Sequence, residues 1–302
     1  MRLFDLHCDT PLEMYRKGAD VQKNDLAVDL ERAACYSSFF ALGAVFTPRE
    51  VSDEAGMEHA RRVLLHWKKS GAPTITRREE LALDGRGFLL TLEDARILNG
   101  GLSSLDELWQ LGVRVITPLW RDLGTLGGAW NTSDGLSHFG KAAVSRALEL
   151  GMLLDVSHAS VPAFWEIYEV CRAAKRPFFA SHSNAFAITK HGRNLDDEQL
   201  RAIAHCGGVC GVTLYPPFLA GDVATLDDVA RHIRHIVDVG GEEFVAIGSD
   251  LDGVDALPQG IADVSDLSRL AEHLSARGLS ARLIDQLFFR NAYRFIFENL
   301  PS

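Results

Sequence analysis

The sequence has little cysteine, no long apolar run and no excess of positive charge. Its five cysteines (Cys8, Cys35, Cys171, Cys206 and Cys210) are an odd number at irregular spacing, which is typical of free thiols and not of a disulfide framework. No apolar run approaches the roughly 20 residues that a membrane-spanning helix needs. No basic segment followed by an apolar stretch precedes the first predicted strand, so no signal peptide is visible. We therefore expect a cytoplasmic protein with no membrane partner.

The balance of charge is negative, with 41 acidic and 31 basic residues and a formal net charge of −10. A negative surface argues against nucleic acid as a partner. No linker, internal repeat or low-complexity segment divides the chain, so we predict one domain over residues 1–302. This length suits a single α/β barrel, which needs about 250 residues plus loop insertions.

Eight short apolar runs rich in β-forming residues alternate with helical patterns. These runs are Leu3–Cys8, Phe39–Phe46, Gly87–Leu92, Val113–Leu119, Met152–Ser157, Pro177–Ser181, Gly208–Tyr215 and Phe244–Ser249. Apolar residues recur at helical spacing over Lys141–Leu150, Leu226–Val239, Asp266–Arg277 and Ser280–Asn299. The alternation predicts a TIM-type (β/α)8 barrel, with an open doubly wound sheet as the alternative. The Gly-rich segment 121–135 is expected to be a loop over the barrel mouth.

Polar residues follow the predicted strands at the point where each strand ends. They are His7 and Asp9 after the first strand, Glu93 after the third, His158 after the fifth, His182 after the sixth and Asp250 after the eighth. Each has an ordinary explanation by itself, such as a core histidine, a helix N-cap or a turn residue. In a parallel barrel, however, all these positions lie on one rim, where such enzymes place their active sites. The shared position therefore predicts one site.

The residue types at these positions favour a metal centre. His7 and Asp9 are two residues apart, so their side chains leave the same face of the strand, and Cys8 points the other way. Neutral imidazole and carboxylate groups suit zinc, and three histidines with two acids can hold two ions if one carboxylate bridges them. Two such ions can share a hydroxide, since a metal-bound water can have a pKa of about 7. The pattern predicts hydrolysis without a serine or cysteine nucleophile.

The chain also resembles a known family over almost its whole length. The matching strings, in the family's order, are DLHCDTP, LTLED, DVSHAS, SHSNA, RNLDDEQL, GVTLYPPFL and GSDLDGV. They resemble the renal or membrane dipeptidase family, peptidase family M19, within the amidohydrolase-like metal hydrolases. The resemblance implies a zinc-dependent dipeptidase with two zinc ions per chain and a small dipeptide as substrate. It is also compatible with a homodimer. His7 and Asp9 would bind one ion, His158 and His182 the other, and Glu93 would bridge them.

The resemblance extends to residues that meet the substrate. Arg193 matches the arginine that grips the terminal carboxylate, Tyr215 matches a tyrosine that lines the site, and Asp250 matches the acid that handles protons and meets the substrate amine. Two positions depart from the family pattern. Trp120 stands where animal members have a histidine that contacts the scissile carbonyl, and tryptophan donates one N–H but cannot titrate. Asp94 replaces the glycine that usually follows the bridging glutamate.

Other functions stay open at this point. One is a binuclear metal hydrolase that acts on another small amide or a lactone; another is a metal- or ligand-binding barrel without activity. A phosphoesterase of the polymerase-and-histidinol-phosphatase type would begin with His-x-His, whereas this chain has His7-x-Asp9. Arg193 separates the first alternative from a dipeptidase, because a free carboxylate on the substrate requires a cationic partner. His138 and His191 are predicted to lie in loops from which they could approach the substrate.

Overall fold

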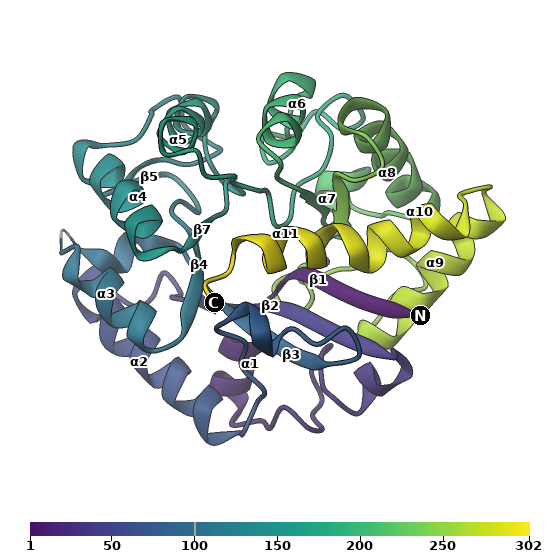
Figure 1. Ribbon diagram of the computed structural model, residues 1–302, viewed down its shortest axis with the longest axis horizontal. Helices are drawn as coiled ribbons and strands as arrows, with labels where there is room; N and C mark the ends of the chain where they lie inside the picture. The colour runs from purple at the N-terminus through teal and green to yellow at the C-terminus, as the bar shows by residue number, and fades with distance from the viewer. Residues whose placement is uncertain (100) are drawn as a thin grey trace.

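The computed structural model describes residues 1–99 and 101–302, which form a mixed α/β fold around one curled parallel sheet (Figure 1). In spatial order its seven strands are β7 (Leu153–Leu154), β4 (Val113–Thr117), β3 (Arg86–Glu93), β2 (Ser38–Phe46), β1 (Arg2–Cys8), β9 (Val245–Ile247) and β8 (Cys210–Val212). The last strand in the sequence, β9, pairs with the first in the sequence, β1. A doubly wound sheet instead reverses its strand order at a switch point, so the observed order argues against that alternative.

The predicted sixth strand is the main difference between the expected and the observed sheet. Segment Pro177–Ser181 forms no regular strand and makes only isolated parallel bridges, from Phe179 to Asp155 and from Ala180 to Cys210. Its Phe179 pairs with one neighbour and its Ala180 with the other, so neither side forms a continuous ladder. The prediction of eight regular strands was therefore wrong by one for the described residues. The two bridges nevertheless connect the edge strands β7 and β8.

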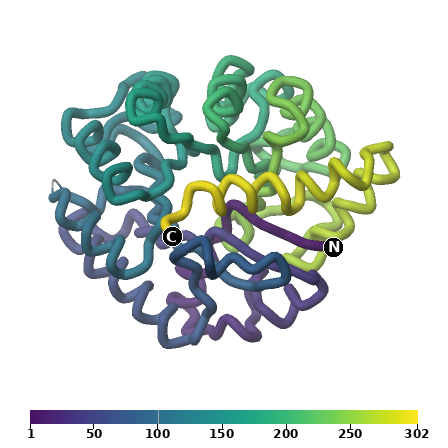
Figure 2. The backbone as a smooth tube through the Cα atoms, in the orientation of Figure 1, coloured from purple at the N-terminus to yellow at the C-terminus, as the bar shows by residue number. Residues whose placement is uncertain are grey.

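Helices lie around the sheet, and Figure 2 traces their path along the chain. The α-helices are α1 (Thr10–Lys17), α2 (Asp53–Lys69), α3 (Ser103–Gln110), α4 (His138–Leu150), α5 (Val161–Ala174), α6 (Asp197–His205), α7 (Pro216–Leu219), α8 (Leu226–Gly240), α9 (Leu267–Ala276), α10 (Ala281–Asp285) and α11 (Asn291–Asn299). Short 3-10 turns are η1 (Arg32–Cys35), η2 (Arg78–Glu80), η3 (Ala95–Leu98) and η4 (Val264–Asp266), and η5 (Gln286–Arg290) is a π-helical turn. Across residues 1–99 and 101–302, no helix combines the length and apolar character that crossing a membrane requires.

The predicted helices and the predicted loop agree with the structure except at their ends. Helix α4 begins three residues before the predicted Lys141 and ends at Gly151, which takes the left-handed conformation typical of a C-cap. The segment Ser280–Asn299 is helical, but the π turn η5 separates α10 from α11. Segment 121–135 contains a small antiparallel hairpin of β5 (Leu123–Gly124) and β6 (Gly127–Gly128).

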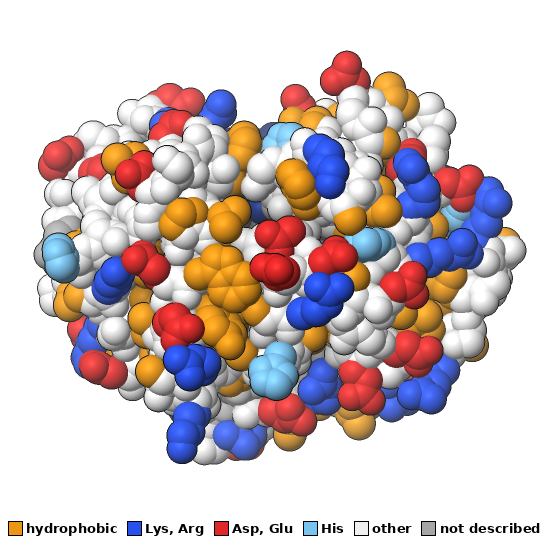
Figure 3. All heavy atoms as spheres, turned by 90° about the horizontal axis from the view of Figure 1, so that it is seen from above, with side chains coloured by type: hydrophobic (Ala, Val, Ile, Leu, Met, Phe, Trp, Pro, Cys, Tyr) orange, Lys and Arg blue, Asp and Glu red, His pale blue; other side chains and the backbone are white. Residues whose placement is uncertain are grey.

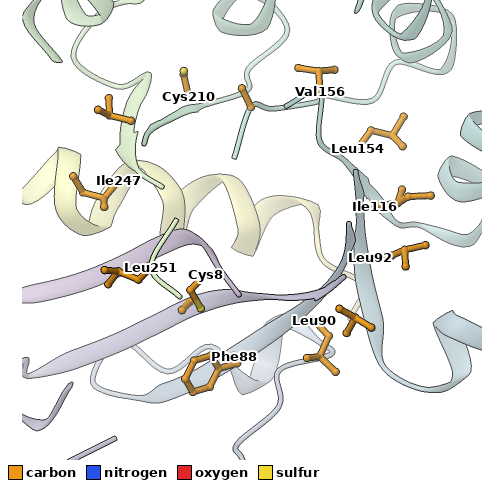
Figure 4. Packing of buried hydrophobic residues seen from close by; sticks show 14 of the residues in the cluster. Cys8, Phe88, Leu90, Leu92, Ile116, Leu154, Val156, Cys210, Ile247 and Leu251 are labelled. Carbon is orange, nitrogen blue, oxygen red and sulfur yellow. The ribbon is translucent and has the colours of Figure 1, made fainter. Parts of the chain in front are cut away.

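Two apolar clusters pack on opposite faces of the strands. Figure 4 shows one of them, in which Phe88, Leu90 and Ile116 point away from the inside of the curled sheet. The other cluster contains Leu89, which adjoins Leu90 in β3, as strand alternation requires. It is closed by α11, which crosses in front of β1 in Figure 1 and contributes Phe295. The amino end of the sheet is therefore filled by apolar side chains.

A bulge in β1 changes which side chains face the inside of the sheet. The register between β1 and β2 shifts between Asp5 and Cys8. As a result Leu6 belongs to the inner cluster and Cys8 to the outer one, although strict alternation would place both on one face. Bulges re-aim side chains in this way next to active sites. Beyond the bulge, Cys8 points away from His7, as predicted, and its thiol donates to the Leu42 carbonyl at 3.4 Å.

The surface carries charges of both signs. Figure 3 shows one face, on which acidic and basic side chains are interspersed around a patch of hydrophobic side chains near its middle. Acidic side chains adjoin that patch in the same view. Exposed ion pairs such as Arg61–Glu107 and Lys23–Glu31 account for part of the mixture, and pairs of this kind contribute little to stability.

Candidate metal centre and active site

The predicted metal ligands all lie at the carboxyl ends of the strands and come together in space. His7 is in β1, and Glu93 is the last residue of β3. His158 follows β7, and His182 follows the bridging segment that ends at Ser181. Their side chains are buried or nearly so. Residues that are far apart in the sequence thus meet because parallel strands end on one side of the sheet.

The five residues form two groups that share one carboxylate. The first group is His7, Asp9 and Glu93, and the second is Glu93, His158 and His182; within each, the ligand atoms lie within 4.8 Å of one another. The same limit also holds for a third set, in which Asp250 lies beside His7 and His182. His7 Nε2 is 3.4 Å from Asp9 Oδ2 and 3.4 Å from Glu93 Oε2. The other Glu93 oxygen, Oε1, is 3.0 Å from His158 Nε2 and 3.8 Å from His182 Nε2. Glu93 therefore presents one oxygen to each group.

His158 and His182 have the protonation that metal ligands require. Burial lowers the pKa of both His158 and His182 well below the ordinary value, so both imidazoles are neutral. His158 Nδ1 lies 2.9 Å from the Trp120 carbonyl, which can only accept, so Nδ1 carries the proton and Nε2 has a free lone pair. His158 Nε2 and His182 Nε2 lie 2.8 Å apart beside Glu93. A set of neutral imidazole nitrogens and carboxylate oxygens fits zinc.

The buried carboxylates need a partner of positive charge, and the ring of His7 lacks a hydrogen-bond partner. Burial raises the pKa of Glu93 to about 7 and that of Asp250 to about 6, because both charged forms are removed from water and lie near Asp9. Burial disfavours the charged form of His7, but Glu93 and Asp9 outweigh it and raise the pKa of His7 well above the ordinary value. Neither ring nitrogen of His7 has a hydrogen-bond partner among the described residues. Buried groups of this kind are typically satisfied by coordinating metal ions.

The loop after β9 closes tightly over two of the carboxylates. Asp250 has φ 65° and its N–H donates to the His7 carbonyl at 3.0 Å. A Cβ atom on Gly253 would lie 2.2 Å from Asp9 Oδ2 and 2.6 Å from Asp250 Oδ1, so only glycine leaves room for both carboxylates. The next acid, Asp252, shapes this loop by accepting from the Thr10 hydroxyl at 2.7 Å. Gly253 was not predicted as a site residue, although its place in GSDLDG marks a turn.

Asp94, which departs from the family pattern, has a local explanation. Its φ is 63°, in the left-handed region that glycine adopts readily and that aspartate tolerates better than most residues. Its carboxylate accepts from Arg96 Nε at 3.1 Å and from the Arg96 backbone N–H at 3.4 Å. These bonds cap the turn η3 and hold the backbone just after Glu93.

A cavity of about 580 Å³ lies beside the ligands. Its lining includes every predicted site residue except His7: Asp9, Glu93, Trp120, His158, His182, Arg193, Tyr215 and Asp250. Trp130 and His191 line it as well, whereas His138 begins α4 and is outside this lining. Loop 121–135 thus contributes Trp130 to the cavity, and of the two loop histidines only His191 reaches it.

Arg193 places a buried cation in this cavity. Its side chain is 3% exposed, and burial lowers its pKa to about 10, which still leaves it charged at neutral pH. Nη2 donates to the His182 carbonyl at 2.9 Å. Nε has no hydrogen-bond partner within the described part of the chain, and the guanidinium lies 5.3 Å from the Phe218 ring centroid. The group is held in place and retains a free donor.

Buried polar residues behind the ligands were missed by the sequence prediction. Asp5 and Asp155 are each 1% exposed and accept hydrogen bonds from Ser249 and Ser181 on neighbouring segments. A partial signal exists, because each aspartate interrupts an apolar strand two or three residues before a predicted histidine ligand. Their serine partners come from other strands, and no spacing within the sequence indicates them.

Comparisons with known proteins identify the family of the chain. A family model described as membrane dipeptidase (peptidase family M19) matches residues 1–299. An uncharacterised protein from the pqqA 5′ region of Klebsiella pneumoniae is 36% identical over 218 residues, which are 68% of this chain and 79% of that protein. An uncharacterised dipeptidase of Schizosaccharomyces pombe is 33% identical over 215 residues, 68% of this chain and 51% of that protein. The chain thus spans about half the length of the yeast relative.

Solved structures extend the likeness to the whole fold. The crystal structure of the dipeptidase AC, a metallopeptidase of family M19, has a TM-score of 0.90 at 25% identity and covers 100% of this chain and 99% of its own. A metallopeptidase from Rhodobacter sphaeroides, bound to a phosphinate mimic of the dipeptide L-Ala-D-Ala, has a TM-score of 0.88 at 25% identity and covers 99% of both chains. The chain belongs to the membrane dipeptidase family, peptidase family M19, and is a metallo-dipeptidase.

Proposed function

We propose that this metallo-dipeptidase uses two zinc ions to hydrolyse the amide bond of small dipeptides. The observation that carries the proposal is the pair of three-residue ligand groups that share Glu93. His7 and Asp9 would hold one ion, and His158 and His182 the other. When bound, the ions supply Lewis acidity that polarises the scissile carbonyl and lowers the pKa of the attacking water.

Arg193 is proposed to bind the free carboxylate at the C-terminus of the substrate. Its guanidinium is buried in the cavity wall and keeps Nε available as a donor. Charge-assisted bonds between arginine and carboxylate are among the stronger hydrogen bonds in proteins. Tyr215 and Trp120 line the same cavity and would contact the rest of the dipeptide. The ligand of the Rhodobacter sphaeroides relative, a dipeptide mimic, supports this substrate class.

Asp250 is proposed to move the proton that amide cleavage requires. Its Oδ1 is 3.9 Å from His7 Nε2, and its carboxylate lines the cavity beside Asp9. It would take a proton from the attacking water and return it to the nitrogen of the leaving amine. Another lining acid, Asp252, is engaged with Thr10 and with the N–H of Ala27, which favours Asp250 for this role.

We also propose that the curled sheet is a complete (β/α)8 barrel. The bridges of Phe179 and Ala180 to the two edges of the sheet support segment 177–181 as the eighth strand of the barrel. Backbone hydrogen bonds from Phe179 to Leu154 at 3.0 Å and from Ala180 to Val209 at 3.0 Å support the same assignment.

The five free cysteines favour a reducing, cytoplasmic location.

The function is tested by assaying the protein before and after removal of metal by a chelator, with L,L and L,D dipeptides as substrates. We expect activity to be lost on chelation and restored by zinc, and free dipeptides to be cleaved faster than their C-terminal amides. Equal rates on free and amidated substrates, or cleavage of lactones and other amides in preference to dipeptides, would favour the alternative hydrolase.

A further inference from the structure

Asp155 joins the ends of three neighbouring segments behind the metal site. Its side chain is buried, and Oδ2 accepts from the Thr117 hydroxyl at 2.7 Å and from the Ser181 hydroxyl at 2.5 Å. Oδ1 accepts from the backbone N–H groups of Ser157 at 2.9 Å and of Ser181 at 2.8 Å. Four donors therefore converge on one carboxylate, which in its ionised form can only accept.

These contacts determine where the protons lie on His182. The Ser181 hydroxyl gives its only proton to Asp155, so its oxygen can act only as an acceptor toward other groups. His182 Nδ1 lies 2.6 Å from that oxygen, so Nδ1 must carry the hydrogen that is donated. The other nitrogen of His182, Nε2, is left with a lone pair that faces Glu93 and His158.

We propose that Ser181, held by Asp155, is a positioning residue that fixes the tautomer and the ring orientation of His182 for metal binding. The proposal rests on the zinc-binding role of His182 given above. The Ser181 backbone is itself confined, since a Cβ at Gly211 or Gly248 would lie 1.9 or 1.7 Å from its carbonyl oxygen. The hydroxyl is therefore presented from a rigid backbone. Partners of this kind typically change metal affinity by about 10- to 100-fold.

A second serine–aspartate pair provides a matched comparison. Asp5 accepts from the Ser249 hydroxyl and from the Ser249 N–H at 2.8 Å, so this pair also links two neighbouring strands. Ser249 Oγ lies 3.4 Å from the carbonyl of His7 and, among the described residues, makes no hydrogen bond to an imidazole ring. Both serines are buried, with exposures of 0% and 1%. Ser249→Ala therefore removes a buried hydroxyl with its carboxylate bond but leaves the ligand rings untouched.

The first test measures zinc affinity of the metal-free protein by competition with a chromophoric chelator. We expect Ser181→Ala to weaken the binding of one zinc ion by about 10- to 100-fold and Asp155→Asn to weaken it in the same direction. Ser249→Ala should bind zinc as the unsubstituted protein does. Equal affinity in Ser181→Ala, or an equal loss in Ser249→Ala, would overturn the proposal. Absence of zinc binding by the unsubstituted protein would instead overturn the proposed function.

The second test reads the tautomer directly and does not depend on metal. In metal-free protein labelled with ¹⁵N-histidine, we expect the His182 signals of an imidazole protonated at Nδ1. In Ser181→Ala the population should shift toward the tautomer protonated at Nε2, while Ser249→Ala leaves it unchanged. Thermal unfolding of each metal-free variant verifies that it is folded. A His182 ring protonated at Nε2 in the unsubstituted protein would overturn the proposal.

Discussion

The two ends of the sheet are built from the same strands but carry opposite chemistry. At the amino end, Phe4, Leu89 and Val115 meet the α11 side chains Phe295 and Ile296 in a fully buried apolar cluster. The carboxyl end holds carboxylates, imidazoles and one arginine around a cavity of about 580 Å³. Burial of apolar side chains stabilises one end, whereas burial of charged groups costs free energy at the other.

This difference shows how stability and function are separated along a strand. Residues of β3 illustrate it, because Leu89 packs in the inner cluster and Glu93, four residues later, faces the metal site. Bound metal ions would offset the cost at the carboxyl end, since ions that bind only the folded chain stabilise it. Substitutions at one end of the sheet should therefore leave the properties of the other end unchanged.

The largest effect on activity is expected from His158→Ala. The substitution removes one of the two imidazoles beside Oε1 of Glu93, so the protein should retain about one zinc ion and lose almost all hydrolysis. Elemental analysis and a dipeptide assay on the same sample measure both. Full metal content with normal activity would show that His158 is not a metal ligand and would contradict the role given to the carboxyl end of the sheet.

Asp250→Asn should keep both metal ions and the fold but lower kcat by about 10²- to 10⁴-fold, because it removes a general acid–base group. Asparagine tolerates the positive φ of this position, so the backbone should not be strained by the change. Single-turnover and steady-state rates, with metal content as a control, check the prediction. Near-normal kcat at full metal loading would contradict the role; loss of an ion would make Asp250 a ligand.

Arg193→Ala should lower kcat/KM by about 10- to 150-fold, since a charge-assisted bond contributes about 1.5–3 kcal/mol. Amidating the C-terminus of the substrate should have an effect of similar size, and the two changes should not add. Arg16→Ala is the control: Arg16 lines the same cavity, but its side chain is 45% exposed and paired with Glu13. Additive losses would mean that Arg193 acts elsewhere.

At the apolar end, Phe295→Ala should lower the free energy of unfolding by about 3–5 kcal/mol, because it leaves a cavity against Phe179. Activity per folded molecule and zinc content should be unchanged, which makes this the smallest effect on catalysis. Phe297→Ala, on the exposed side of α11, should cost about 1 kcal/mol or less. Denaturant unfolding of the metal-free proteins provides the measurement. A loss of zinc affinity in Phe295→Ala would show that the two ends are coupled.

Much of the fold could be predicted because apolar periodicity reports burial directly. The runs of β1, β2 and β3 are long and continuous, and their observed bounds differ little from the predicted ones. The segment Pro177–Ser181 has a similar composition but makes only isolated bridges, which depend on the backbones of its neighbours. The bulge between Asp5 and Cys8 and the π turn η5 also arise from packing between elements and leave no periodic signal.

The candidate site, like the fold, has features that the local sequence predicts and features that depend on contacts between strands. The predicted ligands come together in the structure because position at a strand end is a property of the local sequence and of parallel topology. Gly253 and Ser181 could not be identified, since their importance lies in distances to residues on other strands. Serine and glycine at strand ends are common, and only the geometry distinguishes these two.

The central claim is that the carboxyl end of the sheet holds two zinc ions that share Glu93. It is tested most directly by titrating the metal-free protein with zinc and measuring bound zinc per chain by elemental analysis. The account predicts about two ions per chain in the unsubstituted protein, and fewer at the same free zinc in Glu93→Gln because both ligand groups use this residue. One ion or none at saturation, or undiminished binding in Glu93→Gln, would contradict it.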